Sequence, residues 1–167
     1  MDAQSIAGGV AIQGFLEQST WMLWVMTVLI AGLGSVLPFA PIEPFLLGLG
    51  LIAPPAMLVP LALAATASHM AGKALLYLGS SEATQLLSVR RQQAIEGARI
   101  RLSRHRWYQY LTVFTSAISG VPPFYAITVA AAMVKLPLAP FIAVGTVGRA
   151  CRFVALVLAP QLFRSVT

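Results

Sequence analysis

Apolar residues run along this chain in long stretches that are almost free of charge, and prolines and glycines interrupt them repeatedly. The stretches with the fewest charges cover residues 21–37, 45–68 and 137–148. They approach or reach the roughly 20 residues that a helix needs to cross the hydrocarbon core of a bilayer. We therefore expect an all-α integral membrane protein with one membrane domain.

Two blocks of the chain contain the same order of breaks, offset by 76 to 79 residues. The markers of the first block are Glu43-Pro44-Phe45, then Val59-Pro60, then Gly72-Lys73 with Tyr77, and those of the second are Pro122-Pro123-Phe124, then Leu136-Pro137, then Gly148-Arg149 with Phe153. Agreement in their order indicates a duplicated unit.

A proline pair in the second block predicts a turn inside apolar sequence. The flanking residues 110–120 and 124–134 would each form about 16 Å of helix, too short for a hydrocarbon core of about 30 Å. Pro122 and Pro123 lack amide hydrogens and push the residues before them out of helical geometry. We expect the chain to turn here and return as a re-entrant hairpin.

The first block has a similar break at Pro41 and Pro44, although residues 21–37 are long enough that a tilted full span stays open. A hairpin followed by one crossing helix reverses the side of the membrane, so two such units in tandem would be inverted repeats. Non-helical backbone at membrane depth must be satisfied by protein or by a water-filled cavity. The two hairpin tips should therefore meet inside the protein.

These breaks divide the chain into five parts. We expect an amphipathic interfacial segment at residues 1–20, the first hairpin and its transmembrane helix at 21–79, a basic cytoplasmic loop or helix at 80–107, the second hairpin and its transmembrane helix at 108–160, and a tail at 161–167. The first part contains no lysine or arginine and no small-residue cleavage site, so it does not resemble a cleaved signal peptide.

Composition and charge agree with a membrane protein and predict its orientation. Of the 167 residues, 58% are hydrophobic and 10% are charged, against roughly a quarter charged in soluble domains. The net charge is +6, and six arginines lie between residues 90 and 106, which places that loop on the cytoplasmic side of the inner cell membrane. Orientation explains these arginines, so we expect membrane lipids as partners and no nucleic acid; a homo-oligomer stays open.

Three charged residues inside apolar sequence are candidates for a site. Glu43 at the first hairpin tip could be a proton or cation site, or simply a first-turn acid that the helix dipole favours. Arg149 and Arg152 lie near the middle of the last apolar stretch, where each costs roughly 2.5–3.5 kcal/mol. Glu43 is the acidic residue available in an apolar block, so we predict that it approaches one of these arginines. The arginines could instead bind a lipid phosphate, which suits guanidinium geometry.

One face of the first crossing helix is polar, because His69, Lys73 and Tyr77 recur every four residues. This face should point inward, so His69 and Lys73 join Glu43, Arg149 and Arg152 as candidate residues for binding a substrate or ion. The alternative is that Lys73 and Tyr77 lie near the cytoplasmic end and snorkel to water, which we favour for Lys73. For His69 we favour a buried hydrogen bond rather than catalysis. We expect no enzyme, metal or cofactor, since no serine, histidine and acid set falls on plausible shared faces and the chain has one cysteine.

Short motifs in both halves resemble the DedA/VTT (SNARE-associated) membrane proteins over roughly residues 30 to 160. They are Ser119-Gly120-Val121-Pro122-Pro123 with Gly148-Arg149 and Arg152, and in the first half Pro41, Glu43, Pro44, Gly48, Gly72-Lys73, Tyr77 and Gly79. This resemblance implies two facing re-entrant hairpins and a translocase or scramblase that moves phospholipids or polyprenyl phosphates across the bilayer.

The chain departs from that family in the second hairpin. Members proposed to move lipid phosphates usually have arginines there, whereas this chain has Ser116, Ser119 and Pro123. Binding of an anion would then depend on Arg149 and Arg152. Two alternatives stay open: a proton-coupled exchanger of small ions or drugs that uses Glu43, and a membrane scaffold that transports nothing.

Overall fold

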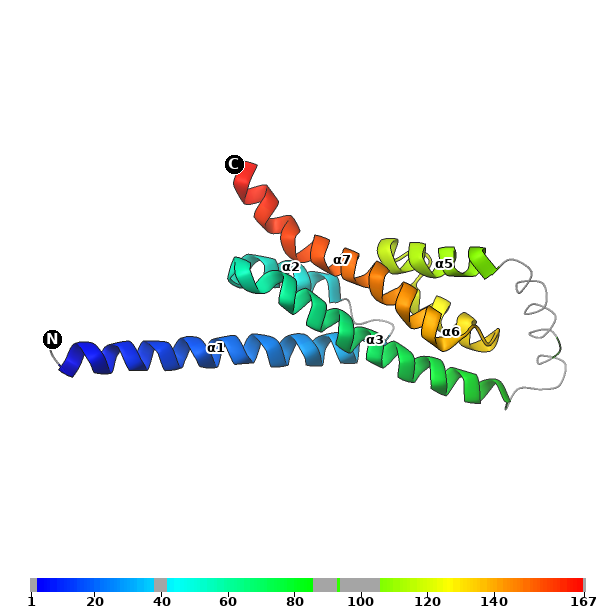
Figure 1. Cartoon of the computed structure of the whole chain (residues 1–167), viewed down its shortest axis with the longest axis horizontal. Helices are drawn as coiled ribbons and strands as arrows, with labels where there is room; N and C mark the ends of the chain where they lie inside the picture. Colours follow the sequence, from blue (N-terminus) through cyan, green and yellow to red (C-terminus); the bar gives the residue numbers. More distant parts are fainter. Residues whose placement is uncertain (1–2, 38–41, 86–92, 94–105, 167) are drawn as a thin grey trace.

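All elements of the described chain are α-helices. The computed structural model describes residues 3–37, 42–85, 93 and 106–166, with side chains at 20–37, 42–82, 93 and 107–163. Within these ranges the helices are α1 (Ala3–Val36), α2 (Ile42–Ile52), α3 (Pro55–Gln85), α5 (Arg106–Ser119), α6 (Phe124–Met133) and α7 (Leu138–Val166) (Figure 1). The all-α prediction is confirmed for this part of the chain. The arginine-rich segment between α3 and α5 lies almost entirely outside the described residues.

Helices α3 and α7 form the centre of the molecule and run in opposite directions (Figure 1). Their segments Pro55–Glu82 and Leu138–Phe163 are long and apolar enough to cross a membrane. Large apolar side chains on them face outward, among them Leu63, Leu75 and Val147, each at least 50% exposed. Such a surface suits lipid better than water, which agrees with the expected membrane association.

Helix α1 is a single helix of 34 residues, about 51 Å long. It does not end near residue 20, where the sequence indicated a boundary between an interfacial segment and the first hairpin. The reason is that no proline occurs before Pro38, so nothing in this stretch interrupts the ladder of backbone hydrogen bonds. The amino-terminal half of α1 extends beyond the other helices (Figure 1).

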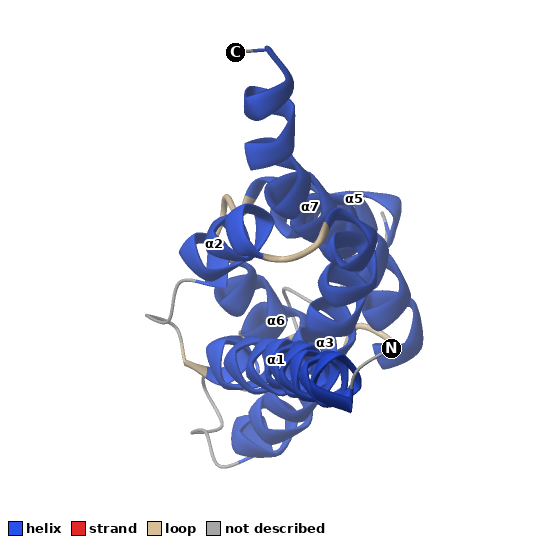
Figure 2. Ribbon diagram, turned by 90° about the vertical axis from the view of Figure 1, so that its left-hand side faces the viewer, coloured by secondary structure: helices blue, strands red, loops and turns tan. Residues whose placement is uncertain are grey.

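The two shortest helices, α2 and α6, each pack against the long helix of the other half of the chain. Helix α1 lies along α3 and α5 along α7, whereas α2 crosses to α7 and α6 crosses to α3. Figure 2 shows α1 nearly end-on, below α2 and α7. Two apolar cores result: one joins Leu46 and Leu49 of α2 to Phe153 and Val157 of α7, and the other joins Met70 of α3 to Phe124 of α6.

The second hairpin turns where the sequence predicts. Helix α5 ends at Ser119 and α6 begins at Phe124, so the chain turns through the proline pair Pro122 and Pro123. Gly120 has a φ of +79°, a left-handed conformation that suits glycine. Helix α6 has 10 residues and α2 has 11, about 15 and 16 Å, so neither can cross a bilayer.

Pro44 does not break a helix, and its assignment as a hairpin-breaking residue is wrong. It is the third residue of α2. A proline is tolerated there because the amide hydrogen it lacks would have no intrahelical partner in the first turn. Helix α1 ends at Val36 and α2 begins at Ile42, and Pro41, the other predicted break, lies outside the described residues.

Several prolines remove the amide donor from the carbonyl four residues earlier, and two of these carbonyls accept a hydrogen bond from a side chain of α7. Arg152 Nη1 donates to Ile118 O at 2.7 Å opposite Pro122, and Gln161 Nε2 donates to Gly50 O at 2.7 Å opposite Pro54. Tyr77 OH of α3 donates to Leu136 O, which lies just before α7. Buried carbonyls need such partners, above all in lipid. These bonds fix the hairpins onto α3 and α7.

Candidate functional site

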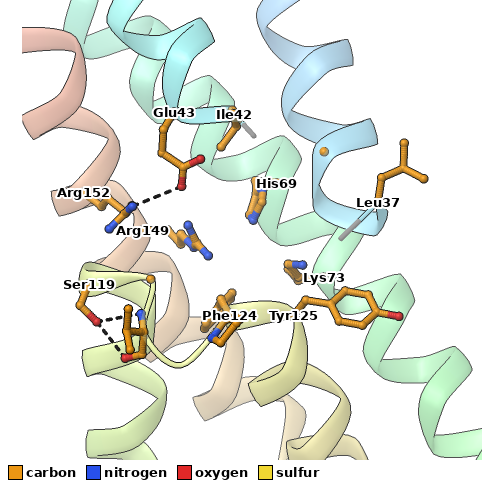
Figure 3. A pocket seen from close by; sticks show the side chains of 14 residues that line it. Leu37, Ile42, Glu43, His69, Lys73, Ser119, Phe124, Tyr125, Arg149 and Arg152 are labelled. Carbon is orange, nitrogen blue, oxygen red and sulfur yellow. Dashed lines mark hydrogen bonds and ion pairs between the residues drawn. The ribbon is translucent and has the colours of Figure 1, made fainter. Parts of the chain in front are cut away.

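A cavity of about 440 Å³ lies where the ends of α1, α2, α5 and α6 meet α3 and α7 (Figure 3). This volume falls within the roughly 300–1,000 Å³ of typical ligand pockets. All five candidate residues from the sequence line it: Glu43, His69, Lys73, Arg149 and Arg152. Residues that flank the two expected hairpin tips, among them Glu43 and Gly120, line this one cavity, while the first tip itself lies outside the described residues.

The cavity lies midway along both candidate spans. His69 stands 14 residues after Pro55 and 13 before Glu82, about 20 Å of helix from either end of that span. Arg149 stands 11 residues after Leu138 and 14 before Phe163, about 16 and 21 Å from the ends of the second span. If α3 and α7 cross a bilayer, these side chains lie near its middle.

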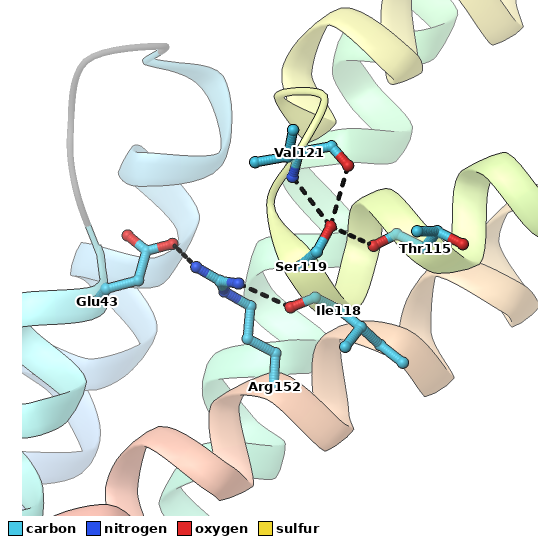
Figure 4. Close-up of polar contacts among 6 residues, drawn as sticks. All are labelled: Glu43, Thr115, Ile118, Ser119, Val121 and Arg152. Carbon is cyan, nitrogen blue, oxygen red and sulfur yellow. Dashed lines mark hydrogen bonds and ion pairs between the residues drawn. The ribbon is translucent and has the colours of Figure 1, made fainter.

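Glu43 and Arg152 form the ion pair that the sequence predicts, with 3.3 Å between Oε1 and Nη2 (Figure 4). The same guanidinium donates through Nη1 to Ile118 O at 2.7 Å. Glu43 is in the first turn of α2 and Ile118 in the last turn of α5, so each charge also meets the favourable end of a helix dipole. The two side chains are 33% and 23% exposed, which indicates partial hydration.

Lys73 does not snorkel to water, so that interpretation is wrong. Its side chain is 3% exposed, and Nζ donates to Ser35 O at 2.5 Å in the last turn of α1. Nζ also lies 5.2 Å from the centroid of the Tyr125 ring. Carbonyls at the carboxyl end of a helix and an aromatic face both stabilise a cation, so Lys73 is satisfied inside the protein. Tyr77 is likewise buried, through its bond to Leu136 O.

Arg149 is buried, and none of the described residues forms an ion pair with it. It is 6% exposed, and within the described part of the chain no hydrogen bond or ion pair involves its guanidinium, whose Nε is fully enclosed. Its Cζ lies 4.7 Å from the ring centroid of Phe124 and 5.7 Å from that of Phe153. The two aromatic rings stabilise the cation but leave its donors without acceptors.

His69 is 4% exposed, and among the described residues neither ring nitrogen has a partner in good hydrogen-bond geometry. The backbone of Ala31 interacts with the ring, so the buried hydrogen bond that the sequence indicates is at most a weak one. The ring packs edge-on against Phe153 with centroids 5.5 Å apart. A polar side chain thus lines the cavity without a strong hydrogen bond to the described protein.

The cavity has a surplus of positive charge. Lys73, Arg149 and Arg152 supply three cations against the single carboxylate of Glu43 among its described lining residues, a net charge of +2 with His69 neutral. Charges in a medium of low dielectric constant interact strongly, so this surplus favours an anion. Among the described residues, no group of three His, Cys, Asp or Glu side chains could hold a metal ion.

Comparisons with protein-family models, with curated proteins and with solved structures found no match for this chain. The likeness to DedA/VTT proteins therefore depends on the motifs in the sequence.

Sequence reasoning missed the aromatic side chains of the site and the polar bonds that shape its wall. Phe124, Tyr125 and Phe153 lie beside the cations, and the sequence marked Phe124 and Phe153 only as parts of the repeat. Ser116 Oγ donates to Pro122 O at 2.6 Å. Ser119 Oγ accepts from the Val121 amide at 3.1 Å (Figure 4). Both serines thus bond to the backbone of the turn.

Proposed function

We propose that this chain is a multi-pass protein of the inner cell membrane that moves lipids with phosphate headgroups across the bilayer, as the resemblance to DedA/VTT proteins implies. The cavity between the hairpin tips is the headgroup site. One observation supports this most: three cations and one carboxylate face a single cavity midway along two helices that suit a membrane. A phosphate at that depth would otherwise lose its hydration without compensation.

Two inverted repeats are part of the proposal, each a re-entrant hairpin followed by a transmembrane helix. Exchanging α1 with α5, α2 with α6 and α3 with α7 leaves the main helix contacts unchanged. Cations also occur in matching places, because Lys73 binds the carbonyl of the second-last residue of α1 and Arg152 that of the second-last residue of α5. Such repeats place a binding site at the midplane, between broken helices.

The rim of the cavity suits the acyl chains of a lipid. Two of its lining residues, Leu37 and Val121, are 55% and 73% exposed and apolar. A headgroup could therefore enter the polar interior while its chains stay in the bilayer outside. This geometry favours a lipid over a small soluble ion, the substrate of the alternative proton-coupled exchanger.

Transport is tested with the purified chain reconstituted in liposomes that contain a fluorescent phospholipid. A membrane-impermeant reductant bleaches the outer leaflet, and the decay that follows reports lipid crossing. We expect wild type to exceed protein-free liposomes, and the double variant Glu43→Gln with Arg149→Ala to lose most of this activity. Equal rates for wild type and the double variant would contradict the proposal.

A scaffold that transports nothing is the second candidate, and one observation favours it: Lys73 and Arg152 both bind backbone carbonyls at helix ends, which is a structural role. If the chain is a scaffold, exchanging the charges of Glu43 and Arg152 should restore the stability that each single replacement loses. Liposomes should then show no flux of lipid, ion or drug. Arg149 and His69 count against a scaffold, because buried polar groups without partners destabilise a fold.

A further inference from the structure

The polar side chains of the cavity fall into two groups, those with protein partners and those without. We propose that Arg149 and His69 together bind the phosphate of the ligand, while Arg152 and Lys73 position the hairpin tips around it. This assignment rests on the proposed function of the cavity and adds to it a specific role for His69. It divides the site into a binding pair and a supporting pair.

Each member of the supporting pair already donates to a backbone carbonyl at the end of a helix. Arg152 donates to Ile118 O and to Glu43, so only its Nε lacks a partner. Lys73 donates to Ser35 O and faces the Tyr125 ring. Withdrawing either cation to bind a ligand would leave the carbonyl of Ser35 or Ile118 unsatisfied at membrane depth.

Arg149 has the geometry of an anion ligand. The rings of Phe124 and Phe153 lie near its charged carbon, at 4.7 and 5.7 Å, and neither ring can accept a strong hydrogen bond. A guanidinium has five N–H donors in one plane, suited to two oxygens of a phosphate at once. Figure 3 shows this side chain at the centre of the cavity, between the Glu43–Arg152 pair and His69.

His69 lacks a strong protein partner for its ring nitrogens. It is 4% exposed, packs edge-on against Phe153, and has no described partner in good hydrogen-bond geometry. Phenylalanine would occupy a similar space without a desolvation cost. His69 and Arg149 line the same cavity, and the charge of Arg149 acts on the imidazole, so the ring can donate to another oxygen of a phosphate that Arg149 binds.

The test measures binding and stability separately, on the purified full chain in detergent micelles. The probes are dihexanoyl phosphatidate, inorganic phosphate, and dihexanoylglycerol, which lacks the phosphate. We expect His69→Phe to weaken phosphatidate binding about fivefold to tenfold and Arg149→Met about tenfold to a hundredfold, the losses typical of a neutral and a charge-assisted hydrogen bond. Both variants should keep or raise the melting temperature, because each removes a buried group without a partner.

Two matched variants should change the melting temperature in the opposite direction. Tyr77→Phe and Arg152→Met remove donors that the fold uses, so both should lower the melting temperature. Tyr77→Phe should bind phosphatidate within about twofold of wild type, because Tyr77 is not among the residues that line the cavity. His69→Gln, which retains a donor and an acceptor, should keep more affinity than His69→Phe and serves as the second test at this position.

Failure of the inference is distinguishable from failure of the proposed function. Wild-type affinity in His69→Phe and Arg149→Met, or equal binding of dihexanoylglycerol, would overturn the binding pair even if liposomes show lipid transport. Phosphatidate binding that depends on both residues supports the pair even if transport is absent. Inorganic phosphate bound as tightly as phosphatidate would support the pair and identify free phosphate as the ligand. No binding of any probe would overturn both proposals.

Discussion

The replacement Tyr77→Phe tests whether a side-chain donor to a backbone carbonyl between two helices stabilises this fold. It removes only the hydroxyl that donates to Leu136 O, which lies just before α7 and outside its helical hydrogen bonds. A buried carbonyl left unpaired costs about 1–3 kcal/mol in proteins generally, whereas hydrogen bonds between membrane helices average about 0.6 and reach about 1.7 kcal/mol. Because Tyr77 is 7% exposed, water cannot readily replace it, and we expect a loss of about 1–2 kcal/mol in unfolding free energy.

The decisive comparison is with Tyr125→Phe. Pro140→Ala provides a second background: position 140 is the third residue of α7, where an amide has no intrahelical acceptor, so Tyr77→Phe should cost the same there as in wild type. Tyr125→Phe is the chemical control, since no hydrogen bond of its hydroxyl occurs within the described residues, and it should stay within about 0.5 kcal/mol of wild type. Unfolding in mixed micelles at increasing denaturing detergent gives these differences. Equal costs of Tyr77→Phe and Tyr125→Phe would refute the reasoning.

Three further changes test the site and its close packing by the same unfolding measurement. Arg152→Met should lower the unfolding free energy by about 2–3 kcal/mol, less than the roughly 3–5 kcal/mol typical of a fully buried pair, because Glu43 is 33% exposed. The double variant Arg152→Met with Glu43→Gln should lose clearly less than the sum of the two single losses; equality with that sum would contradict the ion pair. Gly120→Ala should cost about 1–2 kcal/mol, because φ is +79°; an unchanged midpoint would show that the turn is not needed. Gly148→Ala should destabilise the protein, since a Cβ at position 148 would lie 2.6 Å from the Cβ of Ala117. Gly79→Ala is the control: a Cβ there meets nothing within 4 Å, so the change should be neutral or stabilising. The reverse order of stabilities would contradict the close approach of α5 and α7.

Helix ends were easier to predict from the sequence than the side chains that bind the backbone at those ends. The turn at Pro122 and Pro123 and the meeting of Glu43 with Arg152 follow from proline chemistry and from the scarcity of charge in apolar sequence. Lys73 was mispredicted because water and a helix end can satisfy a lysine equally well. Sequence spacing shows which face of α3 the lysine occupies, but not that the last turn of α1 lies opposite it.

The prolines that shape the hairpins also explain why some of the cations stand at the cavity. Each proline that ends or bends a helix removes a donor from a carbonyl four residues earlier, and in lipid that carbonyl must find another. At Ile118 the new donor is Arg152, so the positive charge there follows from the turn itself. Arg149 satisfies no such carbonyl in the described chain, and neither does His69. Backbone chemistry therefore accounts for Arg152, whereas a buried guanidinium and imidazole without partners need an explanation outside the fold, and a bound phosphate provides one for both.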